Sequence, residues 1–146
     1  MAPRLSPGPL GDTIGYRLRV AQIAAFRRFE AKLSEFGSAP RYLGLLAIIG
    51  TQPGQPQSRL AEAVSLKRSS LVAIIDRLAD EGLVERRQSP TDRRVNSVWL
   101  TDRGEAMLHA LTARAAEEET ELAAGLSPAE RAELVRLLGR VVENLG

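Results

Sequence analysis

The sequence contains no cysteine and only one histidine, His109. The missing thiols exclude disulfides, thiolate metal sites and oxidant sensing through a cysteine. The HExxH, GxSxG, P-loop and GxGxxG patterns are also missing, so no nucleophile with its base and no metal cluster can be assembled. The lone His109 is expected to pack or pair on a helix. We therefore expect no enzyme, no bound metal and no cofactor.

Long apolar runs are missing as well. No stretch approaches the roughly 20 apolar residues that span a bilayer, and the N-terminal residues lack the apolar core of a signal peptide. We therefore expect a cytoplasmic protein. Its 146 residues, 44% of them hydrophobic, are enough for one globular unit and too few for two of ordinary size.

An excess of positive charge is also lacking, since the net charge is only +2, but the charge is unevenly distributed. Residues 105–146 hold eight acidic and four basic residues, so this end is not expected to contact a polyanion. Its run of Glu117, Glu118, Glu119 and Glu121 is better explained as a solvated helix face than as a catalytic pair. The basic residues of the remaining chain are the ones available for an acidic partner.

Residues 57–83 have the pattern of two short helices joined by a turn. In the second helix, apolar residues recur at a spacing that commits one face to a core: Leu71, Ile74, Ile75 and Leu78. Gly82 is placed to end this helix in a left-handed conformation, with Leu83 as the apolar contact beyond it.

The shorter helix before it has its own apolar stripe. The residues expected in the core here are Leu60, Ala61, Val64 and, from the turn, Leu66. Pro56 suits the first helical position, where its missing N–H is harmless.

A hairpin with a basic tip follows. Segments 84–88 and 95–100 flank the turn-forming sequence SPTDRR. Four arginines lie close together in it: Arg86, Arg87, Arg93 and Arg94. They could belong to a solvated turn in which Asp92 pairs with Arg94, but after a helix-turn-helix their mutual repulsion favours a polyanionic partner. This order of elements is a winged helix-turn-helix and points to DNA.

The polar face of the second helix is the expected reading surface. Arg68, Ser69 and Ala73 face outward near its start, with Asp76 and Arg77 further along. Arg68 and Ser69 are expected to discriminate bases, and Ser70 and Arg77 to meet phosphates. Lys67 precedes the helix and cannot accept its unpaired N–H groups. Either Ser69 supplies an oxygen from a slightly later start, or Lys67 serves a nearby phosphate, which we favour.

The run LxxxGLVERRxxxxDRRxxxxxLTDRG, from Leu78 to Gly104, resembles the MarR family of bacterial transcriptional regulators. In this family the arginine of the wing's Asp-x-Arg pair enters the minor groove, and the aspartate orients it by a salt bridge. The resemblance assigns these roles to Arg94 and Asp92. Together the residue pattern and the resemblance give these expected DNA contacts: Lys67, Arg68, Ser69, Ser70, Arg77, Asp92, Arg93 and Arg94.

Outside the winged segment the pattern is helical. We expect a long amphipathic helix over about 11–36, a second helix over about 41–49, and a third from Thr101 to about Ala124. Ser127 and Glu130 form a capping box with Pro128 at the first helical position. The final helix carries an apolar stripe that one chain can hardly bury alone: Leu134, Leu137, Leu138, Val141, Val142 and Leu145.

The predicted fold is therefore mainly α with a small β wing, a winged helix-turn-helix with N- and C-terminal helices forming a dimerisation region. We expect a single MarR-type domain over 1–146, with dimerisation helices at about 10–50 and 102–146 and the winged lobe at about 51–101. A twofold dimer would place two recognition helices about 34 Å apart on a near-palindromic operator. The first nine residues are too rich in proline to be helical, and lie either as a loose arm or across the partner.

The resemblance also implies a small anionic effector, bound between the dimer helices and the winged lobe. The segment GYRLRVAQ at 15–22 is similar to regulators of aromatic acid catabolism, some of which answer to aromatic acyl-CoA thioesters. The residues that could form such a pocket, unless they are only surface, are Tyr16, Arg17, Arg19, Arg41 and Tyr42. The expected function is a dimeric repressor released from its operator by this ligand. The alternatives are a constitutive or architectural DNA-binding protein and a winged helix that binds protein.

Overall fold

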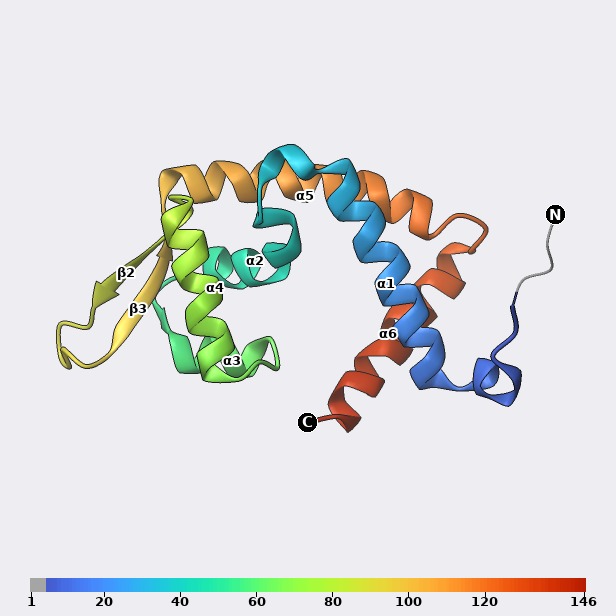
Figure 1. The fold of residues 1–146 in the computed structure, drawn as a ribbon. Coiled ribbons are helices and arrows are strands. Elements are labelled where there is room, and N and C mark those ends of the chain that lie inside the picture. Colours follow the sequence, from blue (N-terminus) through green and yellow to red (C-terminus); the bar gives the residue numbers. More distant parts are fainter. Residues whose placement is uncertain (1–4) are drawn as a thin grey trace. The chain divides into compact units, whose positions relative to one another are not determined.

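The computed structural model describes residues 5–146 of the chain, and most of them are helical (Figure 1). The helices are α1 (Ile14–Lys32), α2 (Leu43–Thr51), α3 (Gln57–Ala63), α4 (Arg68–Asp80), α5 (Asp102–Leu122) and α6 (Pro128–Asn144), with 3-10 turns at Gly8–Asp12, Ser34–Phe36 and Ala39–Tyr42. The strands are β1 (Gln55–Pro56), β2 (Val84–Gln88) and β3 (Asn96–Leu100). The predicted fold class is confirmed. The chain divides into two compact units, residues 1–113 and 114–146, which are described separately.

Helices α3 and α4 lie side by side and form the predicted helix-turn-helix (Figure 1). The apolar faces of both helices are buried in one core, with Leu60, Leu71 and Ile75 at most 1% exposed. The prediction that Leu66 joins this core is wrong, because it is 40% exposed. It follows Ser65, which has φ 55° and ends α3 in the left-handed conformation, and its N–H returns to the Ala61 carbonyl at 2.9 Å.

The end of α4 is fixed by the predicted glycine motif. Gly82 has φ 75°, and its N–H donates to the Ala79 carbonyl at 2.9 Å. The next N–H, of Leu83, donates to the Leu78 carbonyl at 2.9 Å, which completes a Schellman motif. Leu83 is 1% exposed, so the apolar contact beyond the helix is also present. The chain thereby leaves α4 in a fixed direction and enters β2.

The predicted hairpin is confirmed, with β3 beginning one residue later than expected. Strands β2 and β3 are antiparallel, with Val84 opposite Leu100 and Gln88 opposite Asn96. The third strand, β1, has no counterpart in the sequence prediction: Pro56 pairs with Ser97, so the sheet order is β1-β3-β2. Pro56 is therefore the N-cap of α3 and an edge-strand residue, where its missing N–H is tolerated. It is not the first helical residue.

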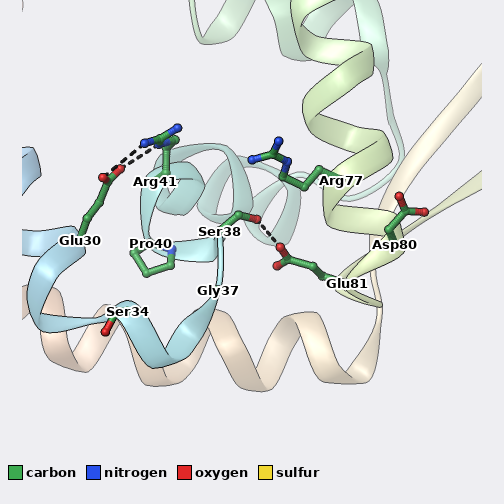
Figure 2. A pocket seen from close by; sticks show the side chains of 9 residues that line it. All are labelled: Glu30, Ser34, Gly37, Ser38, Pro40, Arg41, Arg77, Asp80 and Glu81. Atoms are coloured by element: carbon green, nitrogen blue, oxygen red, sulfur yellow. Dashed lines mark hydrogen bonds and ion pairs between the residues drawn. The ribbon is translucent and has the colours of Figure 1, made fainter.

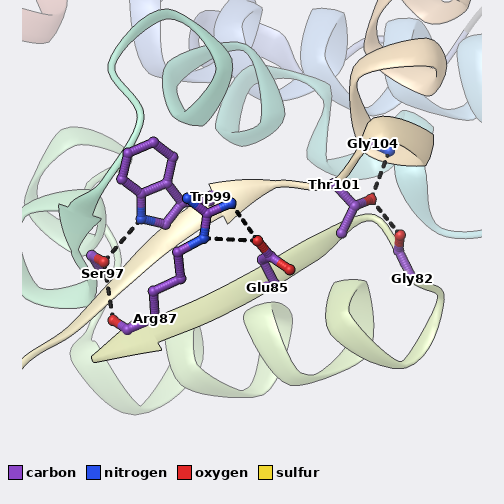
Figure 3. Close-up of polar contacts among 7 residues, drawn as sticks. All are labelled: Gly82, Glu85, Arg87, Ser97, Trp99, Thr101 and Gly104. Atoms are coloured by element: carbon purple, nitrogen blue, oxygen red, sulfur yellow. Dashed lines mark hydrogen bonds and ion pairs between the residues drawn. The ribbon is translucent and has the colours of Figure 1, made fainter. Parts of the chain in front are cut away.

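Helix α5 starts directly after Thr101, which caps it as predicted and ties it to the end of α4 (Figure 3). The Thr101 hydroxyl accepts the Gly104 N–H at 3.0 Å and donates to the Gly82 carbonyl at 2.6 Å. A Cβ on Gly104 would lie 1.9 Å from the carbonyl oxygen of Leu83. Only glycine allows the first turn of α5 to approach the start of the wing this closely.

The N-terminal helices are more broken than expected. The predicted helix over 11–36 ends at Lys32 and is followed by a 3-10 turn, and Gly37 reverses the chain with φ 65°. The predicted helix over 41–49 starts as a 3-10 turn at Ala39 and continues as α2 to Thr51. Gly8 and Pro9 also lie in a 3-10 turn, because proline is compatible with its first positions, so the expectation of a non-helical start is wrong there. Residues 1–4 of that segment lie outside the described residues.

The unit formed by residues 114–146 contains the end of α5 and all of α6. The predicted capping box is confirmed: Glu130 N–H donates to the Ser127 hydroxyl at 3.1 Å, and Ser127 N–H donates to the Glu130 carboxylate at 2.8 Å. Arg131 pairs with Glu119 at 2.8 Å. Five of the six predicted stripe residues of α6 are at least 38% exposed, and Val141 is partly buried. Within residues 5–146, no helix is long and apolar enough to cross a membrane.

Candidate nucleic-acid interface

The polar face of α4 is solvent-exposed along its length. The exposed set contains every predicted contact residue of this helix and its N-cap: Lys67, Arg68, Ser69, Ser70 and Arg77. Opposite them, Leu71, Ile75 and Leu78 are fully buried. This division gives the helix one rigidly packed face and one face whose side chains are free to enter a groove.

Helix α4 starts without a side-chain cap. Lys67 is the N-cap residue, and no side chain in the described part of the chain caps the N–H groups of the first turn. The alternative in which Ser69 supplies the cap is therefore not observed. These N–H groups and the Lys67 ammonium together make the start of the helix electropositive, which suits a phosphate. The contact of Lys67 with a phosphate stays a prediction.

At the tip of the wing, Arg94 is almost fully exposed and lies beside Asp92. The Asp92 carboxylate accepts the Arg94 backbone N–H at 3.0 Å, and the guanidinium Nε is 3.4 Å away. The Arg94 side chain is 92% exposed, so most of it extends into solvent. Arg93 beside it is also exposed and has no ion pair within residues 5–146. The pair has the geometry that the family resemblance implies, and minor-groove entry remains a prediction.

The other two arginines of the wing have partners inside the protein. Arg86 donates from Nη2 to Asp76 of α4 at 2.6 Å and from Nε to the Oε1 of Gln57 at 2.8 Å. It therefore joins β2 to both helices of the helix-turn-helix. Because Asp76 already pairs with it, the Arg86 guanidinium needs no polyanion to offset its charge.

Arg87, the next residue of β2, lies over Trp99 and beside Glu85 (Figure 3). Its guanidinium lies 4.3 Å from the ring centroid of Trp99, a cation–π distance, and pairs with Glu85. The Trp99 indole N–H donates to the Ser97 hydroxyl at 2.9 Å, and that hydroxyl donates to the Arg87 carbonyl at 3.0 Å. The expectation that four wing arginines await a polyanion is thus corrected, because Arg86 and Arg87 stabilise the wing itself.

A cavity of about 200 Å³ lies between the start of α4 and the wing. It is lined by Pro56, Gln57, Ser58, Arg68, Arg94, Val95 and Asn96. The predicted base-reading residue Arg68 and the predicted minor-groove residue Arg94 therefore border one hollow, although 26 positions separate them in the sequence. Gln57, Ser58 and Asn96 were not among the predicted site residues, since isolated polar residues at the ends of short elements carry no recognisable pattern.

A larger cleft, of about 670 Å³, adjoins the other end of α4 (Figure 2). Arg77, Asp80 and Glu81 of this end face residues of the segment that links α1 to α2. The cleft is lined by Glu30, Ser34, Gly37, Ser38, Pro40, Arg41, Arg77, Asp80 and Glu81. A hydrogen bond of 2.6 Å from the Ser38 hydroxyl to the Glu81 carboxylate joins the two sides.

The cleft brings together only part of the predicted ligand site. Arg41 lines it and binds Glu30 at 2.8 Å, which lowers the pKa of that carboxyl by hydrogen bonding and charge. The Arg77 side chain has no hydrogen bond or ion pair within residues 5–146, so its guanidinium is the cation free to bind an anion there. Tyr42 packs against the core of the winged unit and does not line the cleft.

The remaining predicted ligand residues lie elsewhere in the chain. Tyr16, Arg17 and Arg19 occupy the first two turns of α1, about 16 to 21 Å along the helix axis from Glu30. Arg17 is engaged locally, donating to the Gly11 carbonyl at 2.7 Å. Within one chain these three residues and Arg41 do not form one pocket.

Comparison with known proteins places this geometry in a family context. Residues 40–95 match the model of the MarR family. The chain is 37% identical over 135 residues to a proposed transcriptional regulatory protein for the hcr operon of Thauera aromatica, covering 92% of this chain and 81% of that protein.

Two solved proteins share the fold over nearly the whole chain. The transcriptional repressor CouR bound to a 23-mer DNA duplex superposes with a TM-score of 0.87 at 30% identity, covering 96% of this chain and 99% of CouR. CouR has also been solved bound to p-coumaroyl-CoA, with a TM-score of 0.84. The PcaV regulator of Streptomyces coelicolor, in complex with its natural ligand, gives 0.84 at 28% identity, covering 97% of this chain and all of PcaV.

Proposed function

The chain belongs to the MarR family of DNA-binding transcriptional regulators, and on that premise we propose that it is a dimeric repressor released from a palindromic operator by a small anionic ligand. The observation that best supports DNA binding is that Arg68 and Arg94 both line the 200 Å³ cavity between α4 and the wing. A recognition helix and a wing on one face can enter adjacent grooves of the same duplex. Family membership also agrees with the expectation that the chain is not an enzyme.

The dimer is supported by apolar surface that a single chain leaves in water. On α6, Leu134, Leu137 and Val142 are 47%, 43% and 64% exposed. On α1, Ile14 and Phe26 are 67% and 44% exposed. An apolar helix face of this kind is typical of a protein–protein interface. We propose that the helices over about 10–50 and 102–146 form the dimerisation region, and that 51–101 form the winged lobe, within one cytoplasmic domain.

The effector is proposed to be an aromatic acid or its acyl-CoA thioester. CouR binds p-coumaroyl-CoA, and it is similar to this chain over almost its full length. The 670 Å³ cleft lies within the range of small-molecule sites and touches the C-terminal end of α4. A ligand that separates Ser38 from Glu81 would alter the support of the recognition helix. Tyr16 and Arg19 lie too far along α1 to reach this cleft in the same chain. They would contribute to it only from α1 of the partner subunit.

Two alternatives remain distinguishable by experiment. A constitutive or architectural DNA-binding protein would bind a duplex and ignore every small anion. A protein-binding winged helix would bind no duplex. Arg68 and Arg93, which are exposed and have no ion pair within the described residues 5–146, argue against it. Selection from a random duplex library identifies a protein-binding winged helix, which would return no sequence, and titration of the bound duplex with small anions identifies a constitutive DNA-binding protein.

The Arg94→Ala variant is expected to bind the selected duplex more weakly by about 1 to 3 kcal/mol, because a wing tip supplies contacts and no core. Asp92→Ala should act in the same direction and less strongly, since it only orients Arg94. Gel-shift titrations over a range of salt should show a slope reduced by about one unit for the arginine variant. An affinity equal to that of the parent would contradict the wing assignment, and an unchanged melting temperature serves as the control for folding.

The effector proposal predicts reciprocal coupling. A ligand that weakens operator binding must lose affinity by the same factor when the operator is present, because linkage between two sites is symmetric. We expect a coupling free energy of about 1 to 3 kcal/mol for an aromatic acid or its CoA thioester, measured by calorimetry with and without the duplex. Compounds that bind free and DNA-bound protein equally well, or that never bind, would leave the constitutive regulator as the function.

A further inference from the structure

The 200 Å³ cavity between α4 and the wing has the chemistry of an anion site. Among its lining residues are two guanidinium groups, two side-chain amides and one hydroxyl, and no carboxylate. The larger cleft at the other end of α4 has a lining of mixed charge, in which Arg41 and Arg77 lie with Glu30, Asp80 and Glu81. The side chains of Arg68, Ser58 and Asn96 have no hydrogen-bond partner within residues 5–146. Their donors are therefore unused.

The orientation of Gln57 strengthens this assignment. Its Oε1 accepts from Arg86 Nε at 2.8 Å, and a guanidinium can only donate, so the amide cannot be turned the other way. Arg86 is in turn fixed by Asp76 at 2.6 Å. The acceptor end of Gln57 is thus occupied and its NH2 group is left over. Gln57 can therefore donate into the cavity from its NH2 group.

The position of the cavity identifies the anion. A recognition helix in the major groove and a wing tip in the adjacent minor groove are separated by one sugar-phosphate strand. That strand must cross the protein between Arg68 and Arg94, and the hollow bordered by these two residues lies there. Hydrogen bonds from neutral amides and hydroxyls to phosphate oxygens fix the register of a protein on the duplex without reading sequence.

We propose that this cavity seats one backbone phosphate in each half-site, with Gln57, Ser58 and Asn96 as its neutral donors. The proposal rests on the proposed DNA-binding function and on Arg68 and Arg94 facing adjacent grooves. None of the three donors belongs to the base-reading face of α4. They set the depth and register at which that face meets the bases.

The test uses the full-length protein and a duplex that it selects from a random library. Single phosphates of this duplex are replaced, one position at a time, by neutral methylphosphonates. For the parent protein, replacement of one phosphate between the two contacted grooves is expected to weaken binding by about tenfold or more, since a charge-assisted hydrogen bond is lost.

The Gln57→Glu variant makes the test specific. A carboxylate still accepts from Arg86, so the fold is retained, but the cavity now presents a negative charge to the phosphate. We expect about tenfold weaker binding or more to the unmodified duplex, and binding to the methylphosphonate duplex that equals or exceeds it. The sign of the methylphosphonate effect therefore reverses at that one position. The matched control is Gln52→Glu, an exposed glutamine outside the cavity with the same charge change, which should keep the parent pattern.

Each other outcome overturns the proposal. If Gln57→Glu and the parent respond alike at every backbone position, the cavity does not face a phosphate. If inorganic phosphate raises the melting temperature of the parent without DNA, the variant loses this shift, and no methylphosphonate position matters, the cavity binds a free anion instead. If the parent selects no duplex at all, the proposed function itself fails, which is a separate result.

Discussion

The double variant Leu134→Glu and Leu138→Glu is expected to be a folded monomer whose operator affinity is lower by about two to four orders of magnitude. Both leucines lie one turn apart on the apolar face of α6 and are 47% and 38% exposed in the single chain. In a dimer this face would be buried. Each carboxylate buried there without a partner would destabilise the dimer by several kcal/mol, because it loses its hydration.

Loss of the dimer acts on DNA binding through valency. A dimer that holds one half-site presents its second winged lobe to the other half-site at a high effective concentration, and a monomer does not. The winged unit has its own core, in which Leu71, Ile75 and Leu78 of α4 are fully buried together with Leu46 and Leu111. None of these core residues comes from α6. A charge on α6 should therefore leave the helix-turn-helix packed while it opposes the dimer.

Sedimentation velocity and a gel-shift titration with the selected duplex check this prediction together. The control is Ala132→Glu, which places a carboxylate on the opposite, exposed face of the same helix. It should sediment as the parent does and bind the duplex with parent affinity. A double variant that stays dimeric would show that the α6 stripe is not the interface. A monomer with parent affinity would show that one winged lobe suffices for binding.

Much of the fold follows from local signals in the sequence. Gly82 ends α4 as predicted because only a residue tolerant of positive φ can complete the Schellman motif there. Ser127 and Glu130 likewise form their capping box, and the hairpin follows from its turn residues. In each case the interacting groups are close in sequence, so the local sequence pattern is enough to predict the contact.

The predictions that were wrong or missing concern places where the local sequence pattern gives no signal. Strand β1 has only two residues and exists because β3 offers it an edge, which no local pattern predicts. The break after Lys32 falls within a continuous helical periodicity, so the apolar spacing alone gives no reason to end the helix. Apolarity alone predicts Leu66 in the core, whereas the left-handed Ser65 turns it toward solvent.

In the candidate site, too, local features were predicted and side-chain contacts between elements were not. The exposure of Arg68 and the pairing of Asp92 with Arg94 agree with expectations from helix periodicity and from the family motif. The binding of Arg86 by Asp76 and Gln57 is not visible in the sequence, because these residues come from three separate elements. Side-chain partnerships across elements decide which arginines of a basic cluster are free, and a count of charges cannot.

The substitution Gly104→Ala is expected to lower the free energy of unfolding of the winged unit by about 3 kcal/mol or more. In an exposed helix the same change would stabilise by up to about 1 kcal/mol, because alanine is the better helix former. Here the new Cβ would lie 1.9 Å from the Leu83 carbonyl oxygen and 2.9 Å from its carbon, so steric overlap decides the sign.

The Leu83 backbone cannot easily move away from this clash. Its N–H is bonded to the Leu78 carbonyl at 2.9 Å, and its carbonyl accepts the Thr101 N–H at 3.1 Å. Relief would therefore break either the end of α4 or the start of α5. Both hold the wing beside the recognition helix, so duplex binding should fail along with stability.

Urea unfolding followed by circular dichroism measures the loss, with Gly44→Ala as the matched control. Gly44 lies in α2, and a Cβ there would meet no atom of a neighbouring segment within 4 Å, so its substitution should be neutral or slightly stabilising. If Gly104→Ala unfolds at the parent's urea concentration and binds the duplex normally, the close approach of α5 to Leu83 does not position the wing. If only Gly104→Ala is destabilised and its residual folded fraction binds weakly, the contact between Gly104 and Leu83 sets the angle at which the wing meets DNA.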